Sequence, residues 1–376
     1  MNFLFSEEQM LLQESMAKFI ENDYTFEHRQ ENLLSTEGYS LSDWTTFAQL
    51  GWLGVTFDQE YGGFGGGPIE LMLMFEQFGK GLIVEPFLSS IVLAGGALSL
   101  LGTDSQKQHY LSGIIAGSKK SALAFVERTS QYDLCSVSTS LTKVNKGYLL
   151  NGAKTVVVNG LNADFLVVVA RSGGGRSEKE GISFCVVDGK AAGITKRDYP
   201  TLDGFHAAEI QFNDVSILEE DILGAVGKGF PVLEEVIDEG ILAIGSEAVG
   251  CMEVLYKATV EYCKNREQFG QAIGTFQVLK HRMVDMFMEY EQAKSLMYIA
   301  AMRMDEGYNS EAKKAISAFK VQVGKSGRFI SQNAVQLHGG MGMTEELSIG
   351  HYFKRLIMAD TFFGNTDFHI NRFGKL

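Results

Sequence analysis

One acidic residue in the second half of the chain is placed where a carboxylate can act as a base. Residues 231–266 have helical periodicity, and Glu239 falls on a face of that helix made of small and apolar side chains. A carboxyl group withdrawn from water keeps its proton to a higher pH, as a general base working near neutrality requires. We therefore predict that Glu239 removes a proton from a substrate. Its predicted face carries Val232, Val236, Ala243, Ser246 and Gly250.

An ordinary surface or ion-pair acid is the alternative interpretation of Glu239. The neighbouring acids Glu234, Glu235 and Asp238 fall on other faces of the helix, where we expect them to be solvated. If Pro231 opens the helix, Glu239 lies about two turns in, beyond the first turn where the helix dipole favours an acid. A helix-dipole role is therefore not expected.

Composition and charge exclude several classes of function. The chain has 376 residues and a net charge of −13, and no basic block that could hold a nucleic-acid backbone. Its four cysteines lie far apart without the paired spacing of a metal site or a disulfide framework. We predict buried thiols in a reducing compartment, no metal and no nucleic-acid partner. These cysteines are Cys135, Cys185, Cys251 and Cys263.

The start of the chain and its apolar stretches predict no membrane partner. Residues 1–10 contain acids and lack the basic start and apolar run of a signal peptide. The most apolar stretches, near 86–101 and 161–170, are interrupted by glycine and serine or are too short to span a bilayer. We expect a cytoplasmic protein.

Changes in periodicity predict three domains in the order helical, β and helical. Residues 1–117 have helical patterns, 118–225 contain short β-rich runs separated by turn residues, and 226–376 return to long helical segments. Helices of this length that lie side by side suit a four-helix bundle. The fold class is thus α+β, with a middle β-barrel or sandwich domain between two helical domains.

A glycine-rich stretch at 61–68 (YGGFGGGP) invites comparison with a phosphate-binding loop. No Lys-Ser or Lys-Thr follows it, and no strand clearly precedes it, although both belong to that motif. We interpret the stretch as a connector between helices.

Three further stretches resemble the acyl-CoA dehydrogenase family. Residues 266–277 (REQFGQAIGTFQ) are similar to its R-x-x-F-G-x-x-[IL]-x-x-[FL]-Q motif, and 336–342 (QLHGGMG) to its Q-x-x-G-G-x-G motif. Residues 154–160 (KTVVVNG) resemble its K-x-W-I-T-N-G strand. Residues 64–70 and 351–356 are similar, within the family, to the small subunit of pimeloyl-CoA dehydrogenase and to steroid side-chain enzymes.

The resemblance implies an FAD-dependent acyl-CoA dehydrogenase of lipid or steroid catabolism. It also implies a dimer of dimers, with FAD between the β-domain of one subunit and the bundle of its neighbour. Arg266 would place a planar cation on the diphosphate, and Phe269 would pack on a flavin or adenine ring. The glycines Gly339 and Gly340 would let the main chain approach the cofactor closely, although they also suit a helix C-cap. Gln268, Gln277, Gln336 and Thr366 complete the expected contacts on this side.

In much of the family, the base is a glutamate before the Gly-Thr of a C-terminal Tyr-Glu-Gly-Thr. Here that position is Gly364, in the stretch 362–367 (FFGNTD). Some members carry the base on the first long helix of the C-terminal domain instead, and Glu239 matches that position. Asp367, beside the vacated position, is the other candidate base. Gly240 stands where the family usually has arginine, so we expect it to widen the pocket for a branched, dicarboxylic or bulky acyl group, with Gly364 as a second substrate-binding residue.

The β-domain side of the expected flavin site departs from the family. Its usual T-E-P-x-x-G-S loop is 126–132 (VERTSQY), which begins at Val126. Val156 and Val158 replace the tryptophan and threonine that lie against the flavin. Two hypotheses follow. The chain is a catalytic subunit that uses Glu239, or it is a non-catalytic partner that completes the FAD site of a paralogous subunit.

The resemblance also implies partners. We expect a homotetramer, or a heterotetramer with a paralogous subunit, and an electron-transfer flavoprotein as electron acceptor. The sequence does not determine the acyl group.

Overall fold

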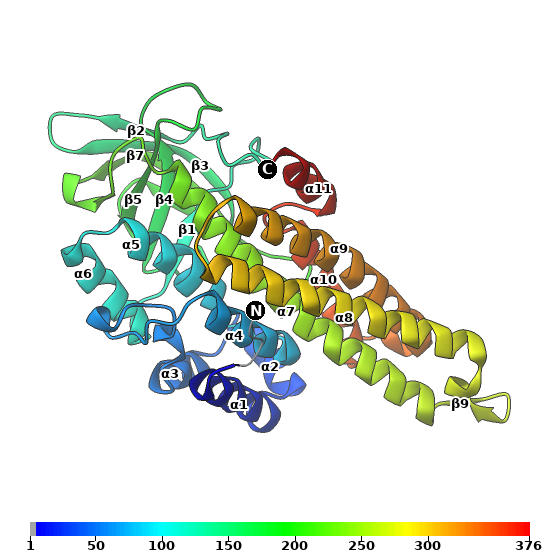
Figure 1. Ribbon diagram of the computed structural model, residues 1–376. Coiled ribbons are helices and arrows are strands. Elements are labelled where there is room, and N and C mark those ends of the chain that lie inside the picture. The colour runs from blue at the N-terminus through cyan, green and yellow to red at the C-terminus, as the bar shows by residue number, and fades with distance from the viewer. Residues whose placement is uncertain (1–4) are drawn as a thin grey trace. The chain divides into compact units, whose positions relative to one another are not determined.

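A computed structural model describes residues 5–376 of the chain (Figure 1). By contact it forms two compact units. The first comprises residues up to 31, 67–83 and 241–376, and the second comprises 32–66 and 84–240. One long helix, α7 (Phe230–Asn265), belongs to both, because the division falls within it at Gly240.

The helices before the sheet begin where the sequence supplies capping residues. Ser6 caps α1 by accepting the Gln9 backbone N–H, and the Gln9 side chain accepts the Ser6 N–H in return. Pro68 opens α4 at its first turn, where a missing N–H costs nothing. The first unit contains α1 (Glu7–Asn22) and α4 (Pro68–Gly81), and α2 (Phe26–Leu33) lies at the division between the units. The second unit contains α3 (Leu41–Gln49), the π-helix η3 (Leu88–Gly95), α5 (Gly96–Leu101) and α6 (Asp104–Ile115).

The glycine-rich stretch is a tightly folded connector, which agrees with the interpretation from the sequence. The N–H groups of Phe64, Gly65 and Gly66 donate to carbonyls of residues 54, 57 and 55. Gly63 also needs to be glycine, because a Cβ there would lie 2.0 Å from the carbonyl oxygen of Phe57. These N–H groups already have acceptors within the chain and are not arranged to hold a phosphate.

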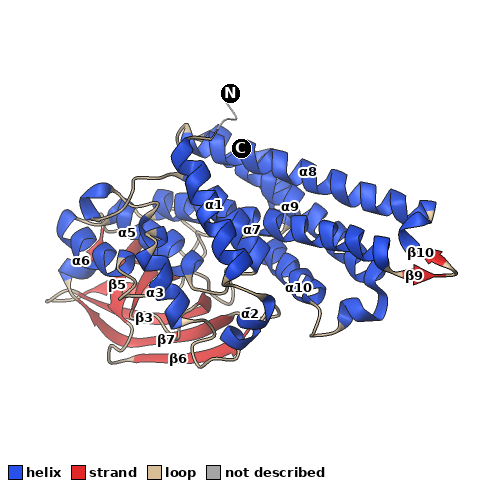
Figure 2. Cartoon of the chain, turned by 90° about the horizontal axis from the view of Figure 1, so that it is seen from below, coloured by secondary structure: helices blue, strands red, loops and turns tan. Residues whose placement is uncertain are grey.

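The second unit contains an eight-stranded mixed sheet in the order β6-β7-β3-β2-β4-β5-β8, with β1 parallel to β4 (Figure 2). Its strands enclose a core of small and branched apolar residues, among them Leu166, Val168 and Ile210. The strands are β1 (Ser121–Ala124), β2 (Ser140–Lys143), β3 (Tyr148–Val158), β4 (Phe165–Arg171), β5 (Ile182–Asp188), β6 (Ile194–Pro200), β7 (His206–Ile217) and β8 (Ile222–Leu223).

The sheet differs from the sequence prediction in the joining of two runs and in strands that the sequence pattern does not predict. The sequence pattern predicts two separate β-rich runs, at 148–150 and 155–158, but they are one strand, β3, which pairs with β7 through register shifts after Leu150 and after Lys154. These bulges absorb the residues that look like a turn in the sequence. Strands β1, β6, β7 and β8 are not among the predicted runs. Strand β6 carries three consecutive charges, Lys196, Arg197 and Asp198, so its pattern ITKRDYP lacks a buried apolar face.

The remaining helices form the bulk of the first unit, and their observed ends lie close to the predicted ones. The sequence pattern predicts long helices at 231–266, 276–306, 310–337 and 345–360. They correspond to α7, α8 (Gln277–Asp305), α9 (Ser310–His338) and α10 (Ser348–Thr361). Helices α8, α10 and α11 (Thr366–Lys375) all pack on α9, as the yellow, orange and red ribbons in Figure 1 show. The short helix α11 was not predicted.

Arg355 of α10 forms a buried ion pair in this unit. It donates two hydrogen bonds of 2.6 Å to the Glu247 carboxylate of α7, and both side chains are almost fully buried. This bidentate geometry compensates much of the cost of removing two charges from water. None of the helices within residues 5–376 combines the length and apolar character needed to cross a membrane.

Candidate functional site

Glu239 lies on α7 beside the junction of η3 and α5, within the second unit. A Cβ atom placed on Gly96, the first residue of α5, would lie 3.3 Å from Oε2 of Glu239 and 3.8 Å from Cγ2 of Val236. The carboxylate thus lies next to the backbone of Gly96, where η3 continues into α5. Along the predicted stripe, Val236, Ala243 and Ser246 are buried, while Glu239 itself is half-buried.

The surroundings of Glu239 favour the protonated form of its carboxyl group. Burial, together with the smaller effect of the nearby charges of Glu235 and Asp238, raises the pKa of its carboxyl group to about 8. Among residues 5–376, no hydrogen bond or ion pair stabilises the charged form. The side chain is only half-buried. These are the properties expected of a general base.

The prediction that Asp238 is solvated is wrong. Its side chain is buried, with 1% relative exposure, because α7 is covered by other elements on more than one face at this point. Glu234 and Glu235 are half-buried. A helix packed on several sides does not reveal from its own periodicity which of its acids remains in water.

Gly364, the position of the common family base, has no room for a side chain. Its φ of 110° is in the region that favours glycine, and a Cβ there would lie 2.4 Å from Cδ1 of Phe368 and 2.8 Å from Nε2 of His369. A carboxylate at 364 would therefore require a different loop. Asp367, the alternative base, has an exposed side chain in the first turn of α11.

Lys320 on α9 holds this loop in place. Its Nζ donates to the carbonyl oxygens of Ala359 at 2.7 Å, Asp360 at 2.8 Å and Gly364 at 2.8 Å. Burial lowers the pKa of Lys320 to about 7, whereas the Asp360 charge acts in the opposite direction. The Thr366 N–H and hydroxyl both donate to the Asp360 carboxylate, so the predicted cofactor residue Thr366 is itself fixed.

The predicted contacts at 266–277 form a projecting hairpin. Strands β9 (Glu267–Gln268) and β10 (Gln271–Ala272) pair, and the turn residues Phe269 and Gly270 have φ values of 56° and 78°. A two-residue turn with both values positive matches the twist of a hairpin, but it is uncommon for phenylalanine. Phe269 is 92% exposed. Arg266, Gln268 and Gln277 are also exposed around it.

The end of α9 lies near the base of this hairpin. The ring of His338, the last residue of α9, stacks on Tyr262 of α7 at a centroid distance of 4.4 Å. Gly339 caps the helix with φ 63° and ψ −141°, so the C-cap interpretation is confirmed. A Cβ on Gly339 or Gly340 would meet no atom of the described chain within 4 Å, and Gln336 is exposed beside them. Open space over glycine backbone, next to an exposed side-chain amide, suits the polar atoms of a nucleotide cofactor.

One β-domain residue of the predicted site has a strained backbone. Val156 has a φ of 52°, which is rare for a β-branched residue, and it is 38% exposed at the second bulge of β3. Its N–H donates to the Tyr199 hydroxyl. The Val126 carbonyl accepts the Thr155 N–H at 2.9 Å, and Val158 pairs with β7. Strain of this kind concentrates at functional sites.

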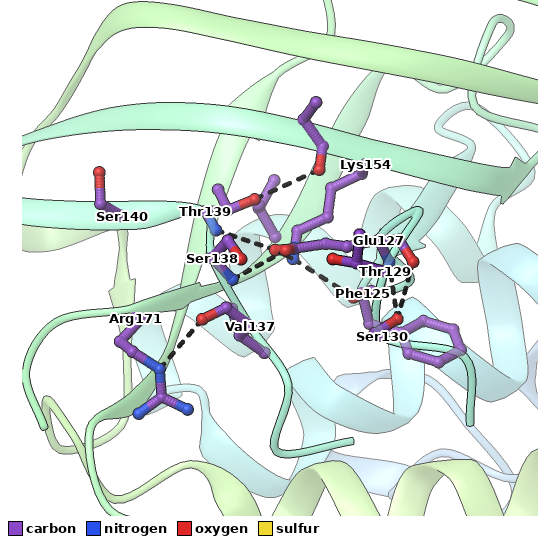
Figure 3. Close-up of polar contacts among 12 residues, drawn as sticks. Phe125, Glu127, Thr129, Ser130, Val137, Ser138, Thr139, Ser140, Lys154 and Arg171 are labelled. Carbon is purple, nitrogen blue, oxygen red and sulfur yellow. Dashed lines mark hydrogen bonds and ion pairs between the residues drawn. The ribbon is translucent and has the colours of Figure 1, made fainter. Parts of the chain in front are cut away.

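The altered loop that follows Val126 is fixed by a buried ion pair (Figure 3). Glu127 accepts the N–H groups of Ser138 and Thr139, and Lys154 Nζ lies 2.8 Å from its carboxylate. The Lys154 charge and these N–H groups outweigh burial and lower the pKa of Glu127. With its oxygens engaged in this way, Glu127 is a structural acid and not a second base.

Replacement of Lys154 by methionine is expected to destabilise the protein by about 3 kcal/mol, because the Glu127 charge would stay buried without its partner. Guanidinium unfolding of Lys154→Met at pH 7 measures this loss. Glu127 has a lowered folded pKa, so its contribution is present above pH 4.5 and disappears as pH falls through the folded pKa. Lys190→Met, which changes an exposed lysine of the same unit, is the control. Equal stability of the two variants at pH 7 would contradict the assignment.

The structure therefore groups the predicted residues in two sets. The hairpin, the end of α9 and the loop 364–366 belong to the first unit, whereas Val126, Val156, Val158, Glu239 and Gly240 belong to the second. Sequence reasoning missed Lys320. The available signal was a lysine among the apolar positions Ile316, Phe319 and Val323 of α9.

Comparison with known families identifies the class of protein that combines these features. Residues 6–118, 122–215 and 227–375 match the N-terminal, middle and C-terminal domains of acyl-CoA dehydrogenase. The chain belongs to the acyl-CoA dehydrogenase family, which comprises FAD-dependent oxidoreductases acting on the CH–CH group of acyl-CoA. The predicted family, fold class and cofactor are thereby confirmed.

Individual relatives are similar along almost the whole chain. The caffeyl-CoA reductase–Etf complex subunit CarC of Acetobacterium woodii is 32% identical, over 93% of each protein. The short-chain-specific acyl-CoA dehydrogenase of Clostridium acetobutylicum is 28% identical over 98% of this chain and 97% of its own. The solved butyryl-CoA dehydrogenase of Megasphaera elsdenii covers 100% of this chain and 99% of its own, with a TM-score of 0.91 at 25% identity.

Proposed function

We propose that the chain catalyses α,β-dehydrogenation of an acyl-CoA thioester, with Glu239 as the base. Glu239 takes the α-proton as the Cα–Cβ double bond forms, and the β-hydrogen leaves with its electron pair. FAD, when bound, accepts that hydride. The observation that carries the proposal is a half-buried carboxylate that has a pKa of about 8 and no stabilising partner within residues 5–376.

The acyl group we propose is branched, dicarboxylic or otherwise bulky. Gly240 follows the base directly, is buried, and stands where the family usually has arginine. The extra room for the acyl group is expected at Gly240, because Phe368 and His369 crowd Gly364. A panel of acyl-CoA thioesters tests this specificity, and a wide preference for short straight chains would contradict it.

We assign the contacts to FAD to two sets of residues. Arg266, Gln268, Phe269 and Gln277 with Gln336, Gly339, Gly340 and Thr366 would hold the cofactor from the helical side. Val126, Val156 and Val158 would hold it from the β-domain side. Phe269 meets the ring of Phe276 edge-on at 6.2 Å but stays 92% exposed, so we propose that the hairpin reaches the cofactor of a neighbouring subunit in a tetramer.

Replacement of Phe269 by alanine is expected to lower flavin affinity about tenfold, which corresponds to about 1.4 kcal/mol of lost ring packing. The free energy of unfolding of the single chain should change little, since the Phe269 ring is almost fully exposed. Absorbance of the purified variant gives the flavin per chain. Phe373→Ala, which removes another exposed phenylalanine, is the control. Full flavin occupancy of Phe269→Ala at limiting FAD would remove Phe269 from the site.

A second candidate function is that of a partner subunit that performs no chemistry. The observation that favours it is the β-domain, where valines occupy the flavin-facing positions and the Val156 N–H is bonded to Tyr199. Such a chain would contribute its hairpin to the flavin of a paralogous subunit. Of the two functions, we favour catalysis, because a carboxylate on a mostly buried helix without a counter-charge among the described residues is costly unless it is used.

The visible spectrum of the chain purified alone separates the two functions. About one flavin per chain, bleached by an acyl-CoA, would establish a self-sufficient dehydrogenase. A colourless protein that no thioester affects would favour the partner role, to be followed by co-expression with a paralogue.

The electron acceptor and the domain limits are also proposals. We propose an electron-transfer flavoprotein as acceptor, which the name of the Acetobacterium relative supports. We retain 1–117, 118–225 and 226–376 as the three domains, and homotetramer and heterotetramer as the two assemblies to be distinguished.

A further inference from the structure

Two adjacent glycines occur where the π-helix η3 passes into α5, and only one of them is explained by packing. Each glycine within a helix costs about 1 kcal/mol relative to alanine. At Gly95, a Cβ would lie 2.6 Å from Cζ of Phe57 and 2.9 Å from the carbonyl oxygen of Ser90, so no larger residue fits. Packing of the Phe57 ring therefore accounts for Gly95.

Gly96 has a different environment. Within 4 Å of a Cβ built there, the only atoms in the described chain are Oε2 of Glu239 at 3.3 Å and Cγ2 of Val236 at 3.8 Å. Its backbone has ordinary helical angles, with φ −58° and ψ −46°, so no turn requires glycine. A methyl group would fit after a shift of a few tenths of an ångström by the Glu239 side chain. The absence of a side chain at Gly96 therefore leaves free the space next to the Glu239 carboxylate.

The electrostatic setting supports this interpretation. Segment 88–101 (LSSIVLAGGALSLL) contains no ionisable side chain, so it offers the carboxylate no counter-charge. The charges that raise the pKa of Glu239 are Glu235 and Asp238, both on α7 itself. The position and solvation of the Glu239 carboxylate therefore depend on the space above Gly96. π-helical segments next to functional residues are a recurrent arrangement, and η3 ends at Gly95.

We propose that Gly96 is a positioning residue for the base: its missing side chain leaves room for the charged Glu239 carboxylate and for the water or substrate carbon that approaches it. This role rests on the proposed function only where turnover is concerned. The effect of Gly96 on the ionisation of Glu239 does not depend on it.

The first test measures stability, not activity. Gly96→Ala should unfold at a slightly higher temperature than wild type at pH 6, where Glu239 is protonated and alanine favours the helix. At pH 9 the methyl group desolvates a charged carboxylate, so the same substitution should lower the unfolding temperature. This change of sign should disappear when Gly96→Ala is made in the Glu239→Gln protein. A temperature difference that does not vary with pH, or a change of sign that persists in the Glu239→Gln protein, would overturn the proposal.

The second test uses the holoenzyme. In Gly96→Ala, the pH at which kcat/KM reaches half its maximum should rise by about half a unit or more, and the plateau should fall about tenfold, because small displacements of a catalytic group are costly. In Gly96→Ser, a hydroxyl able to donate to the carboxylate should move the midpoint below that of Gly96→Ala. Equal midpoints in all three proteins would overturn the role of Gly96. Failure of Glu239 as base has a separate signature, since Glu239→Gln would then retain turnover while the pH-dependent stability difference between Gly96→Ala and wild type stayed.

Discussion

Glu239→Gln is expected to lower turnover of the best acyl-CoA substrate by about 10³-fold, while the protein still folds and binds FAD. The amide has nearly the same shape as the carboxyl group but cannot take the α-proton. The measurement is the rate at which the flavin absorbance bleaches in a single turnover, which reports the chemical step alone. Asp367→Asn, which neutralises the other candidate base, should keep at least half of the rate.

The pH dependence of the wild-type enzyme should agree with this assignment. A base has to be ionised to act, and the pKa of Glu239 is raised to about 8, so kcat/KM should rise tenfold per pH unit below about pH 8 and then level off. Turnover that survives Glu239→Gln, or a profile that is flat from pH 6 to 9, would exclude Glu239 as the base.

The same substitution should increase stability at alkaline pH. The folded state holds the Glu239 proton up to about pH 8, whereas the unfolded chain releases it near pH 4.5, so stability falls as pH rises between these values. Glutamine removes this cost. Because the side chain is partly exposed, we expect a gain on the order of 2 kcal/mol at pH 9 and almost none at pH 5. Loss of activity with a gain in stability is the sign of a residue kept for function.

Lys320→Met is expected to destabilise the protein by about 4 kcal/mol. Methionine has a similar length, but it leaves the buried carbonyls of Ala359, Asp360 and Gly364 without the donor they share. The loop that carries Gly364 should become mobile, and substrate affinity should fall together with stability. Urea unfolding measures the loss, and hydrogen exchange of residues 361–366 locates it.

The control for this substitution lies on the same helix. Lys325 is exposed on α9, so Lys325→Met removes an equal charge without removing a buried donor. Its stability should stay within about 0.5 kcal/mol of wild type, as for other surface substitutions. A loss below about 1 kcal/mol in Lys320→Met would show that the three carbonyls do not depend on the ammonium group.

The long helices and the candidate base could be predicted from the sequence because both depend on local patterns. The sequence predicts α7 at 231–266, and the helix is observed at Phe230–Asn265. The small and apolar residues that single out Glu239 are neighbours of it on this same helix. Gly96 could not be predicted in the same way. It is more than a hundred residues away in sequence, and its pairing with Glu239 is a consequence of tertiary packing.

Other differences have equally specific causes. Helix α11 contains a glycine and two basic residues within ten positions, so its apolar pattern is too short to stand out. The burial of Asp238 depends on elements that cover α7 and not on the helix itself. The sequence does not decide between the two functional hypotheses. Val156 and Val158 replace the tryptophan and threonine that the family places against the flavin, and a sequence alone does not show which other residues replace those contacts.

The crowding at Gly364 has a consequence for the history of this branch of the family. A glutamate restored there by one substitution would collide with Phe368 and His369 and would need a backbone angle that glutamate avoids. Room for that glutamate would require further changes in the loop and in α11. Under the proposed function, with the base on α7, a single substitution could therefore not return the base to position 364, because α11 occupies the space.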